Sequence, residues 1–280
     1  MRSGRYADVT GLTDAGFLEL TDKISRDKGF GCASYKDKCL RRRIAVRMRA
    51  RGVHTYADYA RVLDTDTTEY ERLLDALTIN VTKLFRNWET YSVIADRVVP
   101  ALWDRDDAEI RVWSAGCASG EEPYSLAALF HRRAERARQL ADLDRRVHVL
   151  GSDIDARCLV AAAAGGFEEG DFADTPDDLR MRYFAPVAPF TIIPEVRRLV
   201  HFERRDLLAE NPPEGKHQLI VCRNVLIYFD RDTQERLFEK FQSALAPNGF
   251  LVLGKVETLL GSARGRFVAV DSRERVFRPL

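Results

Sequence analysis

The spacing of hydrophobic and polar positions changes along the chain, and the change divides it into two parts. From about residue 13 to residue 77, apolar side chains recur every three or four positions, as in Phe17, Leu18, Leu20 and Ile24. This period is typical of amphipathic helices, and it returns over residues 56–63 and 70–77. We therefore expect a helical N-terminal domain over residues 1–87, followed by a linker helix within 88–108.

Beyond residue 109, short apolar runs alternate with longer helical patterns. The predicted strands are 110–113, 147–151, 199–203, 219–222, 250–253 and 266–270, and the predicted helices are 124–140, 156–164 and 233–245. This alternation predicts an α/β domain over 109–280, with a doubly wound, mainly parallel, Rossmann-like sheet and helices on both faces. Ligands of such sheets bind at the carboxyl ends of the strands.

One stretch, from about residue 172 to 199, interrupts the alternation. It contains four prolines and a short β-type piece at 190–193. A small inserted β-subdomain is one interpretation and a long irregular connection is the other, although connections of this length without structure are uncommon in compact domains.

Composition narrows the class of protein. The chain has 280 residues, of which 45% are hydrophobic, enough for one large core and a small helical domain. No apolar run approaches the ~18 residues of a membrane helix, and the first residues lack the apolar stretch of a signal peptide, so we expect a cytoplasmic protein. The five cysteines form no Cys-x-x-Cys pair and the five histidines are scattered, so no metal site is expected.

Positive charge is concentrated between Lys36 and Arg51, although the net charge of the chain is only +1. This stretch holds eight basic residues and one acid. At helical spacing, Leu40, Ile44 and Met48 form an apolar stripe, and Lys38, Arg42 and Arg49 project from the opposite side. The basic face is either a solvated helix surface or a docking face for nucleic acid or for an acidic protein helix.

Candidate chemistry begins at the end of the first predicted strand. Residues 111–128 describe a strand, a turn containing Gly116 and Gly120, and a helix with Pro123 in its first turn. Only two glycines of the dinucleotide fingerprint are present, and the carboxylates of Glu121 and Glu122 would repel a pyrophosphate. A cofactor without phosphates, such as S-adenosylmethionine, fits better, although a purely structural strand-to-helix connection would use the same glycines.

Polar residues also follow the next three predicted strands. Asp153 could accept hydrogen bonds from two ribose hydroxyls, whereas Asp155 is placed to cap the following helix. Residues 205–208 suit an adenine edge and face, and residues 223–229 follow the fourth strand. Four such places at one sheet edge favour an adenosine-type cofactor.

Four segments resemble the chemotaxis receptor methyltransferases, the CheR family. They are 80–86 (NVTKLFR), 111–125 (RVWSAGCASGEEPYS), 152–155 (SDID) and 222–230 (CRNVLIYFD), and the resemblance covers nearly the whole chain. It implies a class I methyltransferase fold with a seven-stranded sheet, an all-helical N-terminal domain and an inserted antiparallel β-subdomain. The implied reaction is S-adenosylmethionine-dependent esterification of glutamate side chains on the cytoplasmic helices of chemoreceptors.

The resemblance also assigns roles to individual residues. The implied cofactor contacts, to which the glycine turn adds Gly116, are Asn80, Thr82, Arg86, Glu121, Asp153, Asp206, Leu207, Arg223 and Asn224. Arg86 and Tyr228 match the positions closest to the chemistry. The basic helix, with Lys38, Arg42 and Arg49, resembles the part that docks on the acidic receptor bundle. The insertion looks shorter than in members that bind a receptor's tail peptide, so the resemblance leaves open whether this chain binds such a peptide.

The implied chemistry needs no general base, because glutamate has a pKa near ~4.3 and is already ionised at neutral pH. We expect a monomer that reaches the membrane only through its receptors and does not bind nucleic acid. Three alternatives stay open: an adaptor that senses the cofactor without methyl transfer, a nucleic-acid methyltransferase, and a relative that serves another receptor array.

Overall fold

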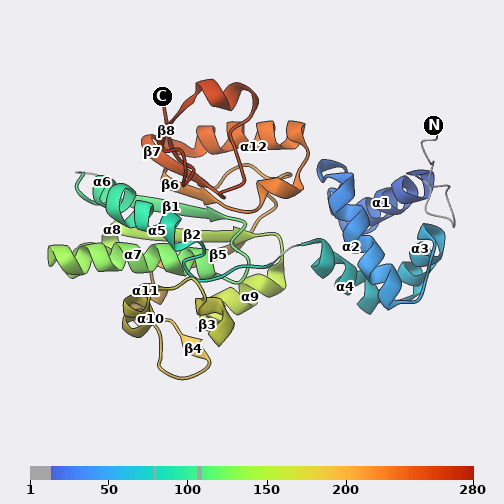
Figure 1. The fold of residues 1–280 in the computed structure, drawn as a ribbon, viewed down its shortest axis with the longest axis horizontal. Coiled ribbons are helices and arrows are strands. Elements are labelled where there is room, and N and C mark those ends of the chain that lie inside the picture. The colour runs from blue at the N-terminus through green and yellow to red at the C-terminus, as the bar shows by residue number, and fades with distance from the viewer. Residues whose placement is uncertain (1–13, 79, 106–108) are drawn as a thin grey trace, which may run out of the picture. The chain divides into compact units, whose positions relative to one another are not determined.

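The computed structural model describes residues 14–78, 80–105 and 109–280. The chain divides into two compact units (Figure 1). The helical unit comprises the chain up to Ile79 together with Tyr228–Asp230, and the sheet unit comprises Asn80–Ile227 and Arg231–Leu280. A three-residue segment from late in the chain therefore belongs with the N-terminal helices.

The helical unit is a small bundle with its own core. Its elements are α1 (Asp14–Lys28), the 3₁₀ turn η1 (Cys32–Ser34), α2 (Asp37–Ala50), α3 (Tyr56–Thr65) and α4 (Thr67–Leu77). The side chains of Thr55 and Asp66 cap α3 and α4 by accepting hydrogen bonds from the first-turn N–H groups. The predicted apolar stripes are buried in the bundle, whereas Leu18 is exposed.

The sheet unit contains the predicted seven-stranded, mainly parallel sheet. Its strands are β1 (Ile110–Ala115), β2 (Val147–Asp153), β5 (Val200–Arg204), β6 (His217–Cys222), β7 (Leu245–Leu253), β8 (Phe267–Asp271) and β9 (Val276–Pro279). Their order is β5-β2-β1-β6-β7-β9-β8, and β9 runs antiparallel to both of its neighbours. The chain winds outward from β1 in one direction and from β6 in the other, which creates a switch point between these strands.

Helices cover both faces of the sheet. They are α5 (Trp88–Val93), α6 (Val99–Trp103), α7 (Glu121–Ala137), α8 (Leu140–Arg146), α9 (Ala156–Ala164) and α12 (Arg231–Ala244), and a π-helical segment, η2 (Ile94–Val98), joins α5 to α6. Figure 1 shows α7 and α12 on opposite sides of the sheet. Successive residues of β1 serve these two sides, because Val112 belongs to the core cluster that includes α7 residues and the Trp113 ring packs edge-on against Phe241 of α12.

The helix predicted as a linker forms part of the sheet unit. Tyr91, Ile94, Val98 and Leu102 are buried in the same core as the residues of β1 and α7. The structure describes this helix from Trp88 to Trp103, and the rest of the predicted range up to residue 108 contains positions outside the described residues.

The interruption between β2 and β5 is a small subdomain that contains the predicted antiparallel pair. Its elements are β3 (Gly166–Phe167), η3 (Glu169–Phe172), α10 (Asp177–Tyr183), β4 (Phe190–Thr191) and α11 (Pro194–Arg197). The sheet has two short strands, β3 and β4, and β3 precedes the predicted boundary at 172. Edge-on contacts among Phe167, Phe172, Phe184 and Phe190 form its core.

No helix among the described residues is long and apolar enough to span a membrane.

Candidate cofactor site at the strand ends

The turn between β1 and α7 requires glycine at two positions. Gly116 and Gly120 have φ angles of 82° and 97°, which residues with a side chain rarely adopt. A Cβ atom on Gly116 would lie 2.5 Å from Val225 Cγ2, and one on Gly120 would lie 2.9 Å from the Cβ atom of Ala162. The glycines therefore serve close packing in the protein itself, so the case for a ligand rests on the polar groups around the turn.

Asp153 and Asp155, at the end of β2, divide two tasks. The Asp153 carboxylate accepts from the backbone N–H groups of Ala118 (2.9 Å) and Asp155 (3.0 Å), which fixes the glycine turn against β2. Burial raises the pKa of Asp153. Asp155 caps α9, as predicted, and also accepts from the Asn80 amide at 2.8 Å. Asn80, from a distant segment, is therefore brought to this edge of the sheet.

Two buried carboxylates open α7. Glu121 is 3% exposed and accepts from the Ser119 hydroxyl at 2.8 and 3.0 Å. Burial raises the pKa of Glu121 to about 7, while hydrogen bonds, including one from Thr82, oppose the rise. Among the described residues, no cationic side chain forms an ion pair with Glu121. A cationic ligand group placed beside this carboxylate would remove part of the cost of burying its charge.

Glu122 has a different environment from that of Glu121. Its Oε1 accepts from the Ser114 hydroxyl at 2.8 Å. Burial raises the pKa of Glu122 to about 7, the positive charges of Arg223 and Arg86 lower it, and the charge of Glu257 raises it. Glu122 is thus an internal counter-charge for the two arginines rather than a group open to a ligand.

The segment that precedes α5 is strained and firmly anchored. Phe85 and Asn87 have φ angles of 50° and 58°, unusual values for residues other than glycine. The N–H of Phe85 donates to the Ser125 hydroxyl and that of Asn87 donates to Asp174, both at 2.8 Å. Arg86, between them, is half-buried and donates to the Val81 carbonyl at 2.8 Å. This backbone conformation fixes where the Arg86 side chain leaves the chain.

Arg223 and Asn224 extend this polar edge beyond β6. Arg223 is 6% exposed and donates to the Asn87 side-chain oxygen at 3.1 Å. Within residues 14–78, 80–105 and 109–280, its buried Nε atom and the buried Oδ1 atom of Asn224 have no hydrogen-bond partner. Buried polar atoms are normally satisfied, so these two are available to a bound polar molecule.

Glu257 is a structural residue of the site that the sequence interpretation missed. Its carboxylate accepts from the N–H groups of Gly254 (2.6 Å), Asn224 (3.0 Å) and Ile227 (3.3 Å). It thereby holds the turn that contains Arg223 and Asn224. Glu257 follows the predicted strand 250–253, which is part of β7. A search for acids after strands, which identified Asp153, would therefore also have found Glu257.

Asp206 and Leu207 lie in a loop that is tied to β2. The N–H of Arg205 donates to the Asp153 carbonyl at 2.9 Å, and Asp206 accepts from the N–H of Leu208 at 2.8 Å. The Lys240 ammonium donates to the carbonyls of Leu207 and Leu208 at 3.0 and 2.9 Å. The half-buried Asp206 and Leu207 are therefore held at the same edge as Asp153, as predicted.

Tyr228 is grouped with the helical unit, whereas Arg86 belongs to the sheet unit. The Tyr228 carbonyl accepts from the N–H of Lys36 at 2.9 Å, and the Arg43 guanidinium lies 5.7 Å from the centre of the Tyr228 ring. The preceding residue, Ile227, is held by Glu257 of the sheet unit.

The basic residues of α2, together with Arg51 at its C-terminal cap, fall into two sets. Four arginines make contacts within the helical unit: Arg41 with Asp14, Arg43 with the Ala76 carbonyl, Arg47 with Glu69 and Arg51 with Asp66. Lys38, Arg42 and Arg49 are exposed and, within the part of the chain that the structure describes, form no ion pair. Leu40, Ile44 and Met48 are buried on the opposite side, which confirms the predicted apolar stripe.

The donor set at the strand ends fits S-adenosylmethionine. Glu121 and Asp153 are buried carboxylates, which can accept hydrogen bonds from amino and hydroxyl groups. The Asn224 side-chain oxygen, which has no partner among the described residues, can accept from an amine. Nothing in the turn provides the lysine that a phosphate loop would need. No group of three or more His, Cys, Asp or Glu residues within the described ranges could hold a metal ion.

Comparison with known proteins agrees with this geometry. Residues 80–276 match the family described as "CheR methyltransferase, SAM binding domain", and residues 15–78 match "CheR methyltransferase, all-alpha domain". The chemotaxis protein methyltransferase of Listeria innocua is 32% identical over 88% of this chain and 91% of its own length, and that of Escherichia coli is 31% identical over 88% and 85%. An uncharacterized 104.1 kDa protein of Rhodobacter capsulatus is 35% identical over 88% of this chain, which spans only 26% of that protein. The chain therefore belongs to the CheR methyltransferase family and is an S-adenosylmethionine-dependent methyltransferase.

Proposed function

We propose that this enzyme forms glutamyl methyl esters on the cytoplasmic helices of chemoreceptors and so adjusts adaptation in chemotaxis signalling. The main support is the pairing of a cofactor site with an unpaired basic helix face in one chain. Relatives named as chemotaxis protein methyltransferases match most of this chain. The proposal includes action as a monomer in the cytoplasm.

We propose that the predicted cofactor residues hold S-adenosylmethionine as follows. Glu121 receives the amino group of the methionyl part, since its buried carboxylate lacks an ionic partner among the described residues. Asp153 receives the ribose hydroxyls, and Asp206 and Leu207 border the adenine. Asn80, Thr82, Arg223 and Asn224 complete the polar lining, and Gly116 allows the turn to approach. When bound, the cofactor supplies an electrophilic methyl group on a positively charged sulfur.

The acceptor needs orientation rather than deprotonation, because a glutamate carboxylate is ionised at neutral pH. Alignment of this kind can contribute on the order of 7–11 kcal/mol in favourable cases. Arg86 is proposed to orient a carboxylate through its forked guanidinium, since its backbone is fixed on both sides by anchored residues. Tyr228 is proposed to orient the acceptor oxygen or to line the path of the methyl group.

The receptor is proposed to dock on the outer face of α2. Lys38, Arg42 and Arg49 lie along one side of the helix, and Val46, at compatible helical spacing, is 48% exposed. These charges have no ion-pair partner in the described part of the chain. Together with the exposed apolar side chain of Val46, they suit an acidic amphipathic helix. A nucleic-acid partner would also respond to this charge, but the matched relatives are named for chemotaxis.

Methyl transfer with a chemical readout tests the proposal. Radiolabelled S-adenosylmethionine is incubated with the enzyme and membranes that contain chemoreceptors, and the labelled receptor is treated with mild base. Label that is released by base indicates an ester and supports the proposal. Cofactor binding without receptor labelling would contradict the proposal and would favour a cofactor-sensing adaptor. Label on the receptors of another array would instead assign the enzyme to that pathway.

A further inference from the structure

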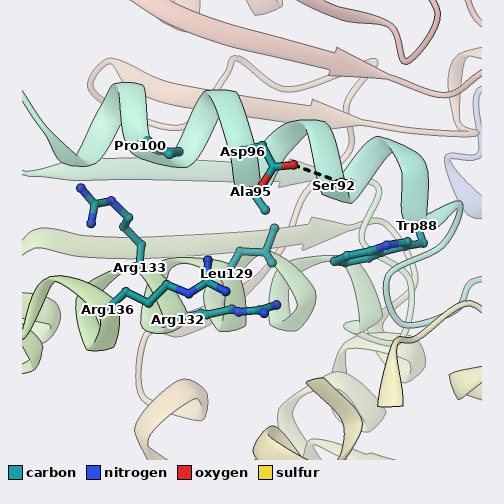
Figure 2. A pocket seen from close by; sticks show the side chains of 9 residues that line it. All are labelled: Trp88, Ser92, Ala95, Asp96, Pro100, Leu129, Arg132, Arg133 and Arg136. Carbon is teal, nitrogen blue, oxygen red and sulfur yellow. Dashed lines mark hydrogen bonds between the residues drawn. The ribbon is translucent and has the colours of Figure 1, made fainter. Parts of the chain in front are cut away.

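A pocket of about 360 Å³ lies between α7 and the continuous helix formed by α5, η2 and α6 (Figure 2). Its lining residues are Trp88, Ser92, Ala95, Asp96, Pro100, Leu129, Arg132, Arg133 and Arg136. All of them belong to the sheet unit, and none is a predicted cofactor contact. The pocket is therefore separate from the set of residues proposed to hold S-adenosylmethionine.

Arginines from α7 form one wall of this pocket. In Figure 2, the side chains of Arg132 and Arg136 extend in the direction of Trp88, and Arg133 stands nearer to Pro100. Arg132 pairs with Asp178 at 3.0 Å and Arg133 pairs with Asp104, and both aspartates are about 60% exposed. Exposed ion pairs contribute little stability, so a bound anion could replace either of them.

Two of the arginines have unused hydrogen-bonding capacity. Arg136 forms no ion pair with any of the residues that the structure describes. The Nε atom of Arg133 is buried without a hydrogen-bond partner. A guanidinium group binds phosphate and carboxylate through paired N–H donors. The arginine wall thus suits an anionic ligand.

The opposite wall offers an aromatic ring and a carboxylate. The half-buried Trp88 ring contacts Phe85 edge-on at 6.0 Å, which holds it in place at one end of the pocket. The Ser92 hydroxyl donates to Asp96 at 3.3 Å, and the exposed Asp96 carboxylate has further capacity to accept. Asp96 lies in η2, and π-helical segments are rare and frequently occur at functional sites.

We propose that this pocket is a second ligand site that binds a nucleoside monophosphate. The arginines match the phosphate, the Trp88 ring offers a face to a planar base, and Asp96 can accept from ribose hydroxyls. The volume falls within the range of small-molecule sites, about 300–1,000 Å³.

Calorimetric titration of adenosine 5′-monophosphate tests this proposal. The full-length enzyme is first saturated with S-adenosylhomocysteine, so that the cofactor site is occupied. We expect saturable binding of one equivalent, and inorganic phosphate should bind at least about tenfold more weakly because it lacks a base. Arg132→Gln and Arg136→Gln should each weaken binding about tenfold, and Trp88→Leu should weaken it more than Trp88→Phe. Arg145→Gln, an exposed arginine on α8, serves as the control and should bind normally.

Three results would overturn the proposal: no saturable binding, equal binding of inorganic phosphate, or unchanged affinity in the arginine variants. Thermal unfolding of each variant verifies that its fold is intact. Arg136→Gln is the decisive variant, because Arg136 has no ion pair with a described residue to lose. The readout is binding rather than methyl transfer, so failure here leaves the proposed receptor methylation untouched. Failure of the cofactor site would instead be visible as absent binding of S-adenosylhomocysteine.

Discussion

Four buried acidic side chains lie at or near the strand ends, and their charge states matter most for ligand binding. Glu121, Glu122, Asp153 and Glu257 all have pKa values raised by burial. They differ in their partners: Asp153 and Glu257 accept backbone N–H groups and Glu122 faces arginines. Glu121 accepts from a backbone N–H group and from hydroxyl groups, and it has no ionic partner among the described residues. Glu121 is therefore the acid whose charge state a cationic ligand would change most.

Cofactor affinity should rise with pH because of Glu121. Because its pKa is about 7, the Glu121 carboxyl of the free enzyme is largely protonated below pH 7 and largely ionised above it. If the ionised form binds the amino group, affinity for S-adenosylhomocysteine should increase about tenfold between about pH 6 and pH 8. The same raised pKa implies that this residue's contribution to the stability of the ligand-free enzyme is lost as pH rises through about 7.

Titration calorimetry across this range measures the effect on cofactor affinity. Glu121→Gln should bind more weakly and with little pH dependence, whereas Glu122→Gln, with an equally raised pKa, should retain the slope. A wild-type affinity that does not change with pH, or a slope that survives Glu121→Gln, would remove Glu121 from contact with the amino group.

Arg86→Ala and Tyr228→Phe should lower turnover far more than stability. Arg86→Ala removes one hydrogen bond to a backbone carbonyl, which costs about 1 kcal/mol, and one of the two positive charges that face buried Glu122, where Arg223 remains. Misalignment of the reacting groups can cost about 100-fold in rate. Initial rates of methyl transfer and thermal unfolding are measured on the same preparations. Arg273→Ala, at an exposed arginine, and Tyr70→Phe, which loses a hydroxyl contact to Asp27, are matched controls. Wild-type turnover in either test variant would exclude that residue from the mechanism.

Some of these residues could be identified from sequence, and others could not. Asp153 and Asp155 could be identified from the sequence because an acid directly after a buried strand has few possible roles. Asp155 precedes a predicted helix and so suits its N-cap, which leaves Asp153 as the candidate ligand. The contact of Asn80 with Asp155 joins segments 75 residues apart, so only the fold brings them together. The positive φ angles at Phe85 and Asn87 could not be predicted either, because neither position is a glycine.

Among the elements, the connection from β1 to α7 is the most tightly specified. Its two glycines, the Asp153 carboxylate and the packing of Val225 all define one backbone path. The strands with long apolar runs were predicted near their observed bounds. By contrast, β3 and β4 have two residues each and β9 has four, too few to produce a period that can be recognised.

Gly116→Ala should destabilise the enzyme by about 2 kcal/mol or more, since the new Cβ requires both a strained φ angle and displacement of Val225. Affinity for S-adenosylhomocysteine should fall together with the unfolding temperature. Gly170→Ala is the matched control, because a Cβ there would have no atom within 4 Å. Equal unfolding temperatures for the two variants would show that the turn tolerates a side chain.

Charge reversal on α2 should weaken receptor recognition without affecting the cofactor. The double variant Arg42→Glu, Arg49→Glu should raise the KM for receptor at least about tenfold and leave affinity for S-adenosylhomocysteine unchanged. Added salt should raise the wild-type KM by screening the same charges. Arg61→Glu, at a residue 76% exposed on α3, is the control. A receptor KM that is insensitive both to the double variant and to salt would place docking elsewhere.

In the whole molecule, the proposed cofactor-binding and receptor-docking functions belong to different units of the chain. The sheet unit contains the residues proposed to bind the cofactor, and the helical unit contains the basic face of α2. The change from a helical period to an alternating pattern was enough to predict this organisation. What it did not reveal is that Tyr228–Asp230 belongs with the N-terminal helices, because pairing between residues almost 200 positions apart leaves no local pattern.

Methylation of chemoreceptor glutamate side chains is the proposed reaction of the whole molecule. The most direct measurement is mass spectrometric mapping of methyl groups on a receptor's cytoplasmic domain after incubation with the enzyme and S-adenosylmethionine. We expect added methyl groups on glutamate side chains of the receptor helices, lost after mild base treatment and absent with Arg86→Ala. Base-stable methyl groups on lysine, or an unmodified receptor despite cofactor binding, would contradict it.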